Sequence, residues 1–306
     1  MPLATTKELF KLAMQRRFAV GAFNVNNMEA VQAIAEAAQE ERAPVIIQVS
    51  QGAIKYAGLA YAAGLVKIAA EQVDVPIVLH LDHGTDFDQN VMCLRAGFTS
   101  LMYDGSKKPF EENVATTKRI AEIAHIVGIP VEAELGRVLQ ATDGVTEEEV
   151  RAAMTDPDQA REFVERTGAD SLAVAVGSVH AMKAAEAELD VERIAAIRAA
   201  TNIPLVLHGS SGVMADSIVA AIENGVCKIN VATYLNQAFV QGLREMIGKL
   251  PDEPDYRKHL GKAREYVKER VREKIRQFRS NGLIDSAGGF VSPKTMHRSA
   301  DIGAPE

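Results

Sequence analysis

The chain has 306 residues, of which 34 are basic and 41 acidic, so its formal net charge is −7. Hydrophobic residues make up 47% of the chain and charged residues 25%, a composition typical of globular proteins that excludes wholesale disorder. The acidic balance argues against a nucleic acid or an anionic membrane as a partner held by bulk charge. No apolar run approaches the roughly 18 residues of a membrane span, and the amphipathic start of the chain shows no secretory signal.

Cys93 and Cys227 are the two cysteines of the chain. Two cysteines are too few for a disulfide framework or for a zinc site built on thiolates. We therefore expect two buried, reduced thiols in a cytoplasmic protein. If the protein binds a metal, its ligands must come from the seven histidines and the carboxylates.

Short β-rich segments alternate with helical patterns along most of the chain. Before the first of them, residues 5–17 form an amphipathic pattern that predicts a helix at one mouth of a barrel. Several of the β-rich segments are apolar nearly throughout, as is typical of parallel strands covered on both faces. The predicted strands cover residues 18–24, 45–50, 76–83, 98–105, 129–136, 171–180, 203–212 and 227–233. The predicted helices between and after them cover about 28–42, 59–72, 86–96, 111–127, 157–168, 191–200, 215–224 and 234–249.

Each predicted strand ends in polar or glycine-rich residues, as in Asp82-His83-Gly84 after the third strand. Eight strand–helix units with polar strand ends indicate an α/β fold, a (β/α)₈ TIM barrel whose functional site lies at the C-terminal ends of the strands. A doubly wound sheet is the alternative, but no G-x-G-x-x-G follows the first strand.

Further segments surround this core. Residues 137–156 form a long polar insertion after the fifth strand and are a candidate lid over the site. Residues 256–279 form a strongly charged C-terminal helix. We expect residues 1–280 to make a single barrel domain and residues 281–306 to form a mobile tail that contacts a neighbouring subunit.

Three histidines follow strands that are far apart in the sequence: His83, His180 and His208 lie at the ends of the third, sixth and seventh predicted strands. Strand ends of one barrel converge on one rim, so these imidazoles can meet at one ion, and three histidines with an open position form a catalytic zinc site. A lone histidine is more often a hydrogen-bonded structural residue, and we expect this of His80.

Carboxylates accompany these histidines. Asp82 directly precedes His83 and is either an acid/base for a substrate hydroxyl or a partner that orients a histidine. Glu132 and Glu134 are two residues apart, so both face the same side of the fifth strand. Such a pair is costly to bury unless it binds a cation or a hydrogen-bond donor. One of the two is then a further metal ligand, or both belong to a buried network with Arg137 or a lysine.

Small residues end the seventh and eighth strands, in the segments 208–212 (HGSSG) and 230–233 (NVAT). Such segments expose backbone N–H groups at the following helix N-termini, which is where these barrels commonly bind phosphate. A plain glycine turn is the alternative.

From residue 1 to about 280 the chain resembles the metal-dependent class II ketose-bisphosphate aldolases. This family is a zinc-dependent (β/α)₈ barrel, usually a homodimer or homotetramer, that cleaves a phosphorylated ketose into dihydroxyacetone phosphate and an aldehyde. The resemblance rests on the motifs GAFNVNN (21–27), LHLDHG (79–84), GFTSLMYDGS (97–106), FEENVATTK (110–118), VEAELG (131–136), GSVH (177–180), LVLHGSSG (205–212) and KINVAT (228–233).

The resemblance implies roles for the metal and for the acid/base. His83, His180 and His208 would hold one Zn²⁺, with Glu134 as a second position for a mobile ion. The zinc would bind the ketone and adjacent hydroxyl oxygens and stabilise an enediolate, to which Asn230 would donate a hydrogen bond. Asp82 would take the C4 hydroxyl proton during cleavage.

The resemblance also implies substrate contacts. Gly209, Ser211 and Thr233 would hold the C1 phosphate, with a monovalent cation such as Na⁺ or K⁺ nearby. Asn24 and Ser50 would face the aldehyde half. Arg257 would bind the terminal anion, and in many relatives it comes from a neighbouring subunit.

This chain departs from the family pattern around the substrate. The usual His-Gly-x-Tyr after the sixth strand is replaced by His180-Ala181-Met182-Lys183, and the usual Gly-Gly-x-Glu-Asp lid is absent from residues 138–144. Ala232 and Tyr234 also differ from common family residues. These changes leave the substrate open, with fructose 1,6-bisphosphate as the default and tagatose 1,6-bisphosphate or 6-deoxy-6-sulfofructose 1-phosphate as alternatives.

Two other functions remain open. A Schiff-base aldolase would need a desolvated lysine at a strand end, for which Lys183 is the nearest candidate, whereas Lys228 is expected to begin its strand on the wrong side of the barrel. A non-catalytic paralogue that stabilises a partner subunit is the third hypothesis, motivated by the altered lid.

Overall fold

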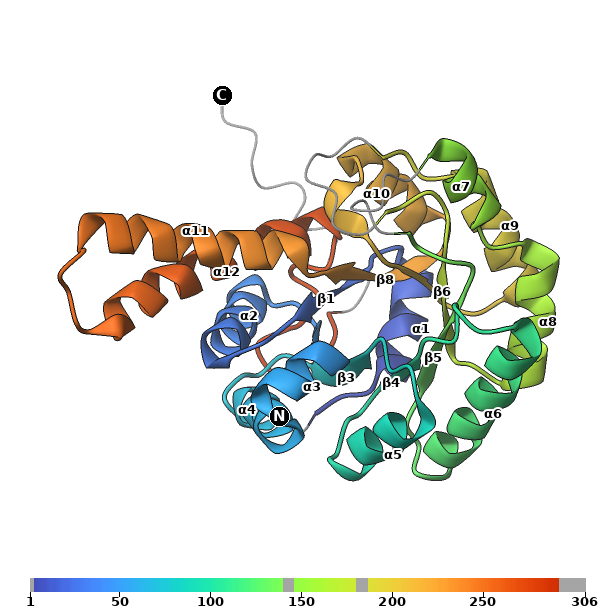
Figure 1. Cartoon of the computed structure of the whole chain (residues 1–306), viewed down its shortest axis with the longest axis horizontal. Coiled ribbons are helices and arrows are strands. Elements are labelled where there is room, and N and C mark those ends of the chain that lie inside the picture. The colour runs from blue at the N-terminus through green and yellow to red at the C-terminus, as the bar shows by residue number, and fades with distance from the viewer. Residues whose placement is uncertain (1–2, 140–145, 180–186, 292–306) are drawn as a thin grey trace.

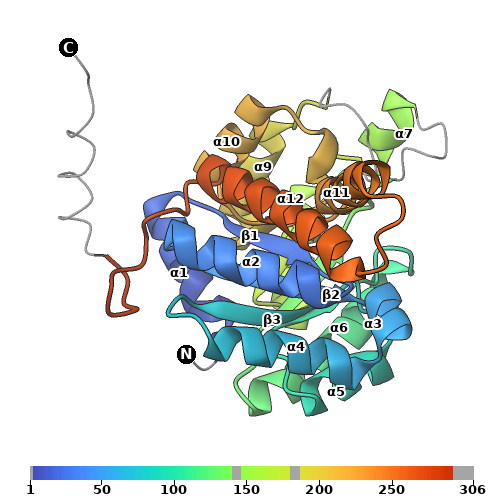
Figure 2. The same ribbon diagram turned by 90° about the vertical axis from the view of Figure 1, so that its left-hand side faces the viewer.

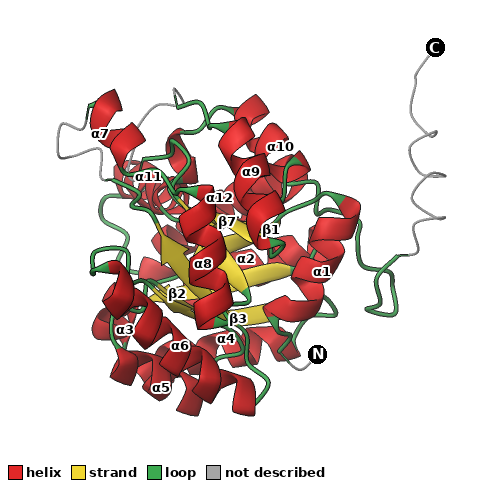
Figure 3. Ribbon diagram, turned by 90° about the vertical axis from the view of Figure 1, so that its right-hand side faces the viewer, coloured by secondary structure: helices red, strands yellow, loops and turns green. Residues whose placement is uncertain are grey.

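The computed structural model describes residues 3–139, 146–179 and 187–291. Eight parallel strands pair in the order β3-β2-β1-β8-β7-β6-β5-β4, and bridges between His80 and Ser100 and between Gly84 and Tyr103 join β3 to β4. The predicted (β/α)₈ barrel is confirmed, and Figure 3 shows helices surrounding the strands. The strands are β1 (Val20–Asn24), β2 (Val45–Ser50), β3 (Ile77–Asp82), β4 (Leu101–Tyr103), β5 (Val131–Leu135), β6 (Ser171–Val174), β7 (Leu205–Leu207) and β8 (Val226–Val231).

The helices follow the predicted alternation with the strands (Figure 1). All eight strands are buried along almost their whole length, as expected for a parallel sheet covered by helices on one side and filled by its own side chains on the other. The helices are α1 (Thr6–Arg16), α2 (Met28–Glu41), α3 (Gln51–Ala57), α4 (Leu59–Glu71), α5 (Phe87–Arg95), α6 (Phe110–Ile126), α7 (Glu147–Ala152), α8 (Pro157–Thr167), α9 (Val191–Thr201), α10 (Ala215–Glu223), α11 (Thr233–Lys249) and α12 (Tyr256–Gln277).

The structure differs from the sequence prediction where strands end. The fourth, sixth and seventh strands are shorter than predicted and end at Tyr103, Val174 and Leu207, so Asp104 and His208 directly follow their strands. Helix α3 was not predicted, because Ser50 was interpreted only as the end of the second strand. Ser50 is also the N-cap of α3, and its Oγ accepts a hydrogen bond from the Ala53 N–H at 3.2 Å. Helix α7 lies inside the insertion predicted as a polar lid and begins with a capping box between Thr146 and Glu149.

Helix α1 covers the end of the barrel opposite the site. Ala4, just before it, donates to the carbonyl of Ile77, the first residue of β3. The α1 side chains Leu9, Phe10 and Ala13 are at most 3% exposed. Because the bottom of the barrel is covered in this way, a ligand enters from the C-terminal strand ends.

Helices α11 and α12 form a long hairpin that projects beyond the barrel (Figure 1), while the rest of α12 lies along α2 (Figure 2). Residues that follow α12 remain packed on the barrel. Leu283 and Ile284 are 1% and 2% exposed, and the Ile284 N–H donates to the carbonyl of Arg42 at 3.0 Å. The first residues of the expected tail, up to Val291, therefore pack on the barrel in this structure. Residues 292–306 are outside the described part.

No single helix of the described residues is long and apolar enough to cross a membrane; α3 and α4 meet that length and composition only as a pair bent by 100°.

Glu41, the last residue of α2, links α12 to the barrel through hydrogen bonds and ion pairs. Its carboxylate accepts from Arg272 Nε at 2.8 Å and from Arg276 Nη2 at 2.7 Å. Burial raises the pKa of Glu41, but the hydrogen bonds and charges of the two guanidinium groups outweigh it, so the pKa lies below its usual value.

We predict that Glu41→Ala lowers the free energy of unfolding by about 2 kcal/mol, since hydrogen bonds to charged groups contribute roughly 1.5–3 kcal/mol. Urea denaturation measures this. Glu40→Ala is the matched control, because Glu40 binds Lys268 at 2.9 Å with 42% of its side chain exposed, and it should cost less than about 1 kcal/mol. Equal losses for both variants would contradict the assignment.

Candidate active site

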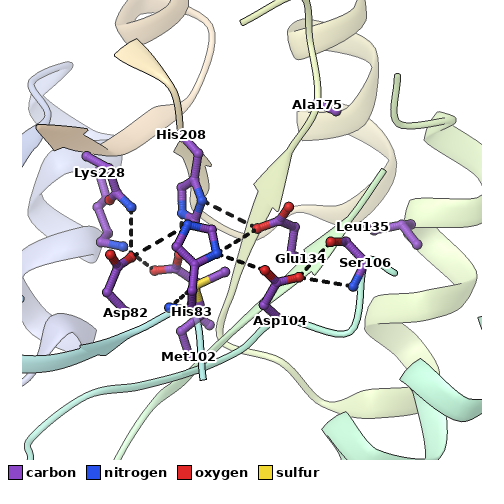
Figure 4. A network of polar contacts seen from close by, with 12 residues as sticks. Asp82, His83, Met102, Asp104, Ser106, Glu134, Leu135, Ala175, His208 and Lys228 are labelled. Atoms are coloured by element: carbon purple, nitrogen blue, oxygen red, sulfur yellow. Dashed lines mark hydrogen bonds and ion pairs between the residues drawn. The ribbon is translucent and has the colours of Figure 1, made fainter. Parts of the chain in front are cut away.

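Polar side chains from several strand ends meet at the rim of the barrel. Figure 4 shows Asp82, His83, Asp104, Glu134 and His208 pointing toward one another. They come from β3 and its end, the loop after β4, β5, and the residue after β7. The convergence predicted for the strand ends is thus observed for His83 and His208. His180 lies outside the described residues.

His83 occupies a strained backbone position. Its φ is +49°, the left-handed region that non-glycine residues rarely adopt and that is enriched at functional sites. Its Nδ1 lies 2.8 Å from Asp104 Oδ2 and 3.8 Å from Glu134 Oε2. Burial lowers the pKa of His83, but the charge of Asp82, the hydrogen bond to Asp104 and the charge of Glu134 raise it to about 10. The surroundings of this ring therefore favour a positive charge.

His208 lies beside His83, with 4.7 Å between the ring centroids. Its Nε2 is 3.1 Å from Glu132 Oε1, and its Nδ1 is 3.4 Å from Glu134 Oε2. Burial lowers the pKa of His208, but the hydrogen bonds to Glu132 and Glu134 outweigh this and raise it. The ring thus stands between two carboxylates.

Glu132 belongs to a buried network, one of the two alternatives left open for the glutamate pair. Its Oε2 accepts from Lys228 Nζ at 2.8 Å, and all of these side chains are at most 1% exposed. Burial raises the pKa of Glu132, but the charge of Lys228 and the hydrogen bond to His208 hold it well below its usual value. His80 is also in the network, as expected of a structural histidine, with Nδ1 2.8 Å from Ser100 Oγ.

Asp82 is held by two amides. Asn24 Nδ2 donates to one carboxylate oxygen at 2.7 Å, and Asn230 Nδ2 donates to the other at 3.1 Å. Burial raises the pKa of Asp82, but the positive charges of His83, Lys228 and His208 and the hydrogen bond from Asn24 outweigh it and lower the pKa. Asp82 is therefore an ionised carboxylate fixed in one orientation.

The donor atoms of this cluster suit a metal ion. Two groups each place their ligand atoms within 4.8 Å of one another. The first consists of Asp82, His83 and His208, and the second of His83, Asp104 and Glu134. Imidazole nitrogens and carboxylate oxygens are ligands that zinc accepts. The described residues can thus hold one ion in either of two adjacent positions that share His83.

A cavity of about 400 Å³ opens above this cluster. Gly209 has φ +65°, which glycine adopts without strain, and with Ser211 it forms one wall. Thr233, the first residue of α11, forms another, and the N-cap residue Ala232 makes no side-chain hydrogen bond that would cover the helix end. Of the predicted site residues, the cavity is lined by Asn24, Asp82, His83, Glu134, Gly209, Ser211, Asn230 and Thr233.

Two predicted substrate residues do not line this cavity. Ser50 is paired in register with Asp82 but uses its hydroxyl to cap α3. Arg257 lies in the first turn of α12, at the outer end of the hairpin, with 83% of its side chain exposed and a 2.7 Å contact to Asp255. It does not reach the cavity of its own chain.

The profile of the family described as Fructose-bisphosphate aldolase class-II matches residues 4–283. The chain belongs to this family. It is therefore a class II aldolase, an enzyme of the lyase class.

Individual relatives of this class II aldolase match along nearly their whole length. The chain is 45% identical over 284 residues to "Probable fructose-bisphosphate aldolase" of Bacillus subtilis, covering 92% of this chain and 99% of the relative. It is 44% identical over 303 residues to fructose-bisphosphate aldolase of Thermus caldophilus, with the same coverage. The crystal structure of the YdjI aldolase from Escherichia coli K12 superposes with a TM-score of 0.79 at 37% identity, covering 92% and 98% of the two chains.

Sequence reasoning missed several residues of this class II aldolase site. Asp104, at the end of the fourth predicted strand, was not predicted to contact His83. Lys228 was expected at the start of its strand, whereas it lies inside β8, with its side chain in the barrel interior. Lys107 and Arg137 line the cavity and were not assigned to the substrate. Alternation along β8 places Lys228 on the same side as Asn230, which was the available signal.

Gly84 permits the close approach of β3 and β4 behind His83. A Cβ at this position would lie 2.6 Å from the Met102 carbonyl oxygen and 2.7 Å from Asn90 Nδ2. Backbone atoms cannot move aside cheaply, so glycine is required here for steric reasons.

We predict that Gly84→Ala lowers the free energy of unfolding by about 1–3 kcal/mol, the usual cost of overpacking. Gly64→Ala provides the control, because Gly64 lies in α4 and a Cβ added there would have nothing within 4 Å, and alanine should stabilise a helix there by about 0.5–1 kcal/mol. Thermal unfolding of both variants measures the two shifts. An unchanged midpoint for Gly84→Ala would contradict the steric argument.

Proposed function

We propose that this class II aldolase is zinc-dependent and cleaves a ketose 1-phosphate that carries a second anionic group at C6, giving dihydroxyacetone phosphate and an aldehyde. Fructose 1,6-bisphosphate is the default substrate. One observation supports this most: a single cavity brings together Asp82, the metal-donor residues and the N-terminus of α11. Asp82 is held there by two amides, and a helix N-terminus is a common phosphate-binding site.

The donor set fits the metal. His83 shares one group of donor atoms with Asp82 and His208 and a second group with Asp104 and Glu134. Of these, His83, His208 and Glu134 are the proposed ligands, with His180 as the third histidine. A zinc ion supplies Lewis-acid polarisation of a carbonyl when it is bound at such a site. We further propose a monovalent cation, Na⁺ or K⁺, near the phosphate.

Asp82 is proposed to accept the C4 hydroxyl proton as the C3–C4 bond breaks, and to return it in the condensation direction. An ionised carboxylate is needed for this, and the lowered pKa of Asp82 keeps it ionised. Asn24 and Asn230 orient the carboxylate, and Asn230 is proposed also to donate to the oxygen of the dihydroxyacetone phosphate half.

The C1 phosphate is proposed to bind Gly209, Ser211 and Thr233. The N–H groups at the start of α11 and the serine and threonine hydroxyls are donors, and the positive end of a helix dipole favours an anion. Because the net charge of the chain is −7, attraction of a substrate with two anionic groups has to come from such local groups.

The second anion has two candidate sources of positive charge. Lys107 and Arg137 line the cavity within the same chain. Arg257 remains the proposed contact from a neighbouring copy, which requires a homodimer or homotetramer in which the α11–α12 hairpin reaches the next site. Ser50 is proposed to contact the aldehyde half through the same hydroxyl that caps α3. A cytoplasmic location is part of the same proposal.

The function is tested with a panel of ketose 1-phosphates that vary the C4 configuration and the C6 anion. We expect cleavage of fructose 1,6-bisphosphate that EDTA abolishes and added Zn²⁺ restores. Faster cleavage of tagatose 1,6-bisphosphate or 6-deoxy-6-sulfofructose 1-phosphate would replace the default substrate. Borohydride trapping with full resistance to EDTA would establish a Schiff-base aldolase, and no lyase activity with no bound zinc would favour the non-catalytic paralogue.

We predict that Asp82→Ala retains zinc but lowers kcat by about 10²–10⁴-fold, the range for loss of a general acid or base. Metal analysis and steady-state cleavage assays measure the two properties. Asp88→Ala, an exposed carboxylate in the first turn of α5, is the control and should leave both unchanged. Loss of zinc together with activity would show that Asp82 is a ligand or a structural residue instead.

A further inference from the structure

We propose that Lys228 is a positioning residue of the metal site, which acts through Glu132 to hold the His208 ring in the orientation and tautomer that a metal requires. This inference rests on the proposed zinc dependence. It concerns the layer of side chains directly below the proposed ligands, inside the barrel, which does not line the cavity.

A continuous chain of contacts joins the two residues. Lys228 Nζ donates to Glu132 Oε2 at 2.8 Å, and the other carboxylate oxygen lies 3.1 Å from His208 Nε2. The Glu132 carboxylate thus bridges the ammonium and the imidazole with one oxygen each. Glu132 lies in β5, Lys228 lies in β8, and His208 directly follows β7. The bridge is therefore held by the strands of the barrel.

The bridge determines which nitrogen of His208 faces the site. Both ring nitrogens face a carboxylate, Nε2 the Glu132 oxygen at 3.1 Å and Nδ1 the Glu134 oxygen at 3.4 Å. With a metal ion on the Glu134 side, the neutral ring would offer its Nδ1 lone pair to the ion and keep its proton on Nε2, where it donates to Glu132. Metal-binding histidines commonly donate their second ring nitrogen to a carboxylate in this way. Glu132 therefore orients His208 as a ligand through Nδ1.

Lys228 is needed because Glu132 is otherwise buried without a full charge partner. The side chains of Lys228 and Glu132 are 0% and 1% exposed. Within the described ranges, Lys228 is the lysine or arginine that forms an ion pair with Glu132. Removal of one partner of a buried ion pair is strongly destabilising because it leaves an uncompensated buried charge. We therefore expect the Glu132 carboxylate to lose its orientation when Lys228 is removed.

His80 holds Lys228 from the other side. Its Nε2 is 3.3 Å from Lys228 Nζ, while its Nδ1 is 2.8 Å from Ser100 Oγ. Burial and the charge of Lys228 lower the pKa of His80 to about 3, so the ring is neutral and Nε2 accepts from the ammonium. The lysine is therefore held between an acceptor on β3 and the carboxylate on β5.

The test compares Lys228→Met with the parent chain as metal-free protein titrated with Zn²⁺ against a chelator of known affinity. We expect the zinc affinity to fall by about 10- to 100-fold, the usual effect of removing a group that orients a metal ligand. Visible absorption of the cobalt-loaded proteins gives a second readout, in which Lys228→Met should show altered band positions or intensities because the ligand geometry changes.

Cys227→Ala is the matched control. Cys227 is the adjacent residue of β8, is 1% exposed, and its side chain points to the opposite face of the strand. It should retain the parental zinc affinity and cobalt spectrum. If it loses affinity as Lys228→Met does, the effect is a general one of β8 packing and the proposal is wrong.

If Lys228→Met does not fold, Lys228→Gln replaces it, since glutamine can still donate to Glu132 without a charge. A loss of at least about tenfold in zinc affinity supports the proposal. Parental affinity and spectrum in a folded Lys228 variant overturn it. A parent chain that binds no zinc overturns the proposed function instead, so the two failures are distinguishable.

Discussion

The need to balance buried carboxylates determines the interior of this barrel. Asp82, Glu132 and Glu134 are each at most 4% exposed. Burying an ionised carboxylate costs several kcal/mol unless a cation or several donors compensate it. Lys228 is the compensating cation for Glu132, and two asparagines donate hydrogen bonds to Asp82. Glu134 faces the rings of His83 and His208.

The site therefore has two layers with different tasks. In the lower layer, charges are paired within the chain and every group lies on a strand or beside one. In the upper layer, His83 has a strained backbone and lies among Asp82, Asp104 and Glu134, which together favour a cation. The lower layer can be rigid because its charges are paired within the chain, and this rigidity supports the strained backbone of His83 above it.

The hairpin of α11 and α12 connects the site to the outside of the molecule. Helix α11 begins at the cavity with Thr233, and α12 returns to the barrel, where Glu41 binds Arg272 and Arg276. Anchoring of α12 thus keeps the N-terminus of α11 in place at the rim. The same hairpin carries Arg257 away from its own cavity, which is why the proposed contact of that residue requires a second copy.

The sequence by itself determined the barrel and the main rim residues of the site. Eight apolar segments at βα spacing leave few other folds, and a residue that follows a parallel strand lies at the C-terminal rim whatever the details of packing. His83, His208, Asp82 and Asn230 could therefore be assigned to one place from their positions in the chain, and the family motifs added their roles.

Only the tertiary structure decided the partners of these residues. Asp104 meets His83 and Lys228 meets Glu132 because the barrel closes with a particular register, and register is a property of the whole sheet. The packing of residues 281–291 and the distance of Arg257 from the cavity are decided in the same way, by contacts between segments far apart in the sequence. Local patterns carry strand and helix periodicity, but they do not carry the distances across a barrel.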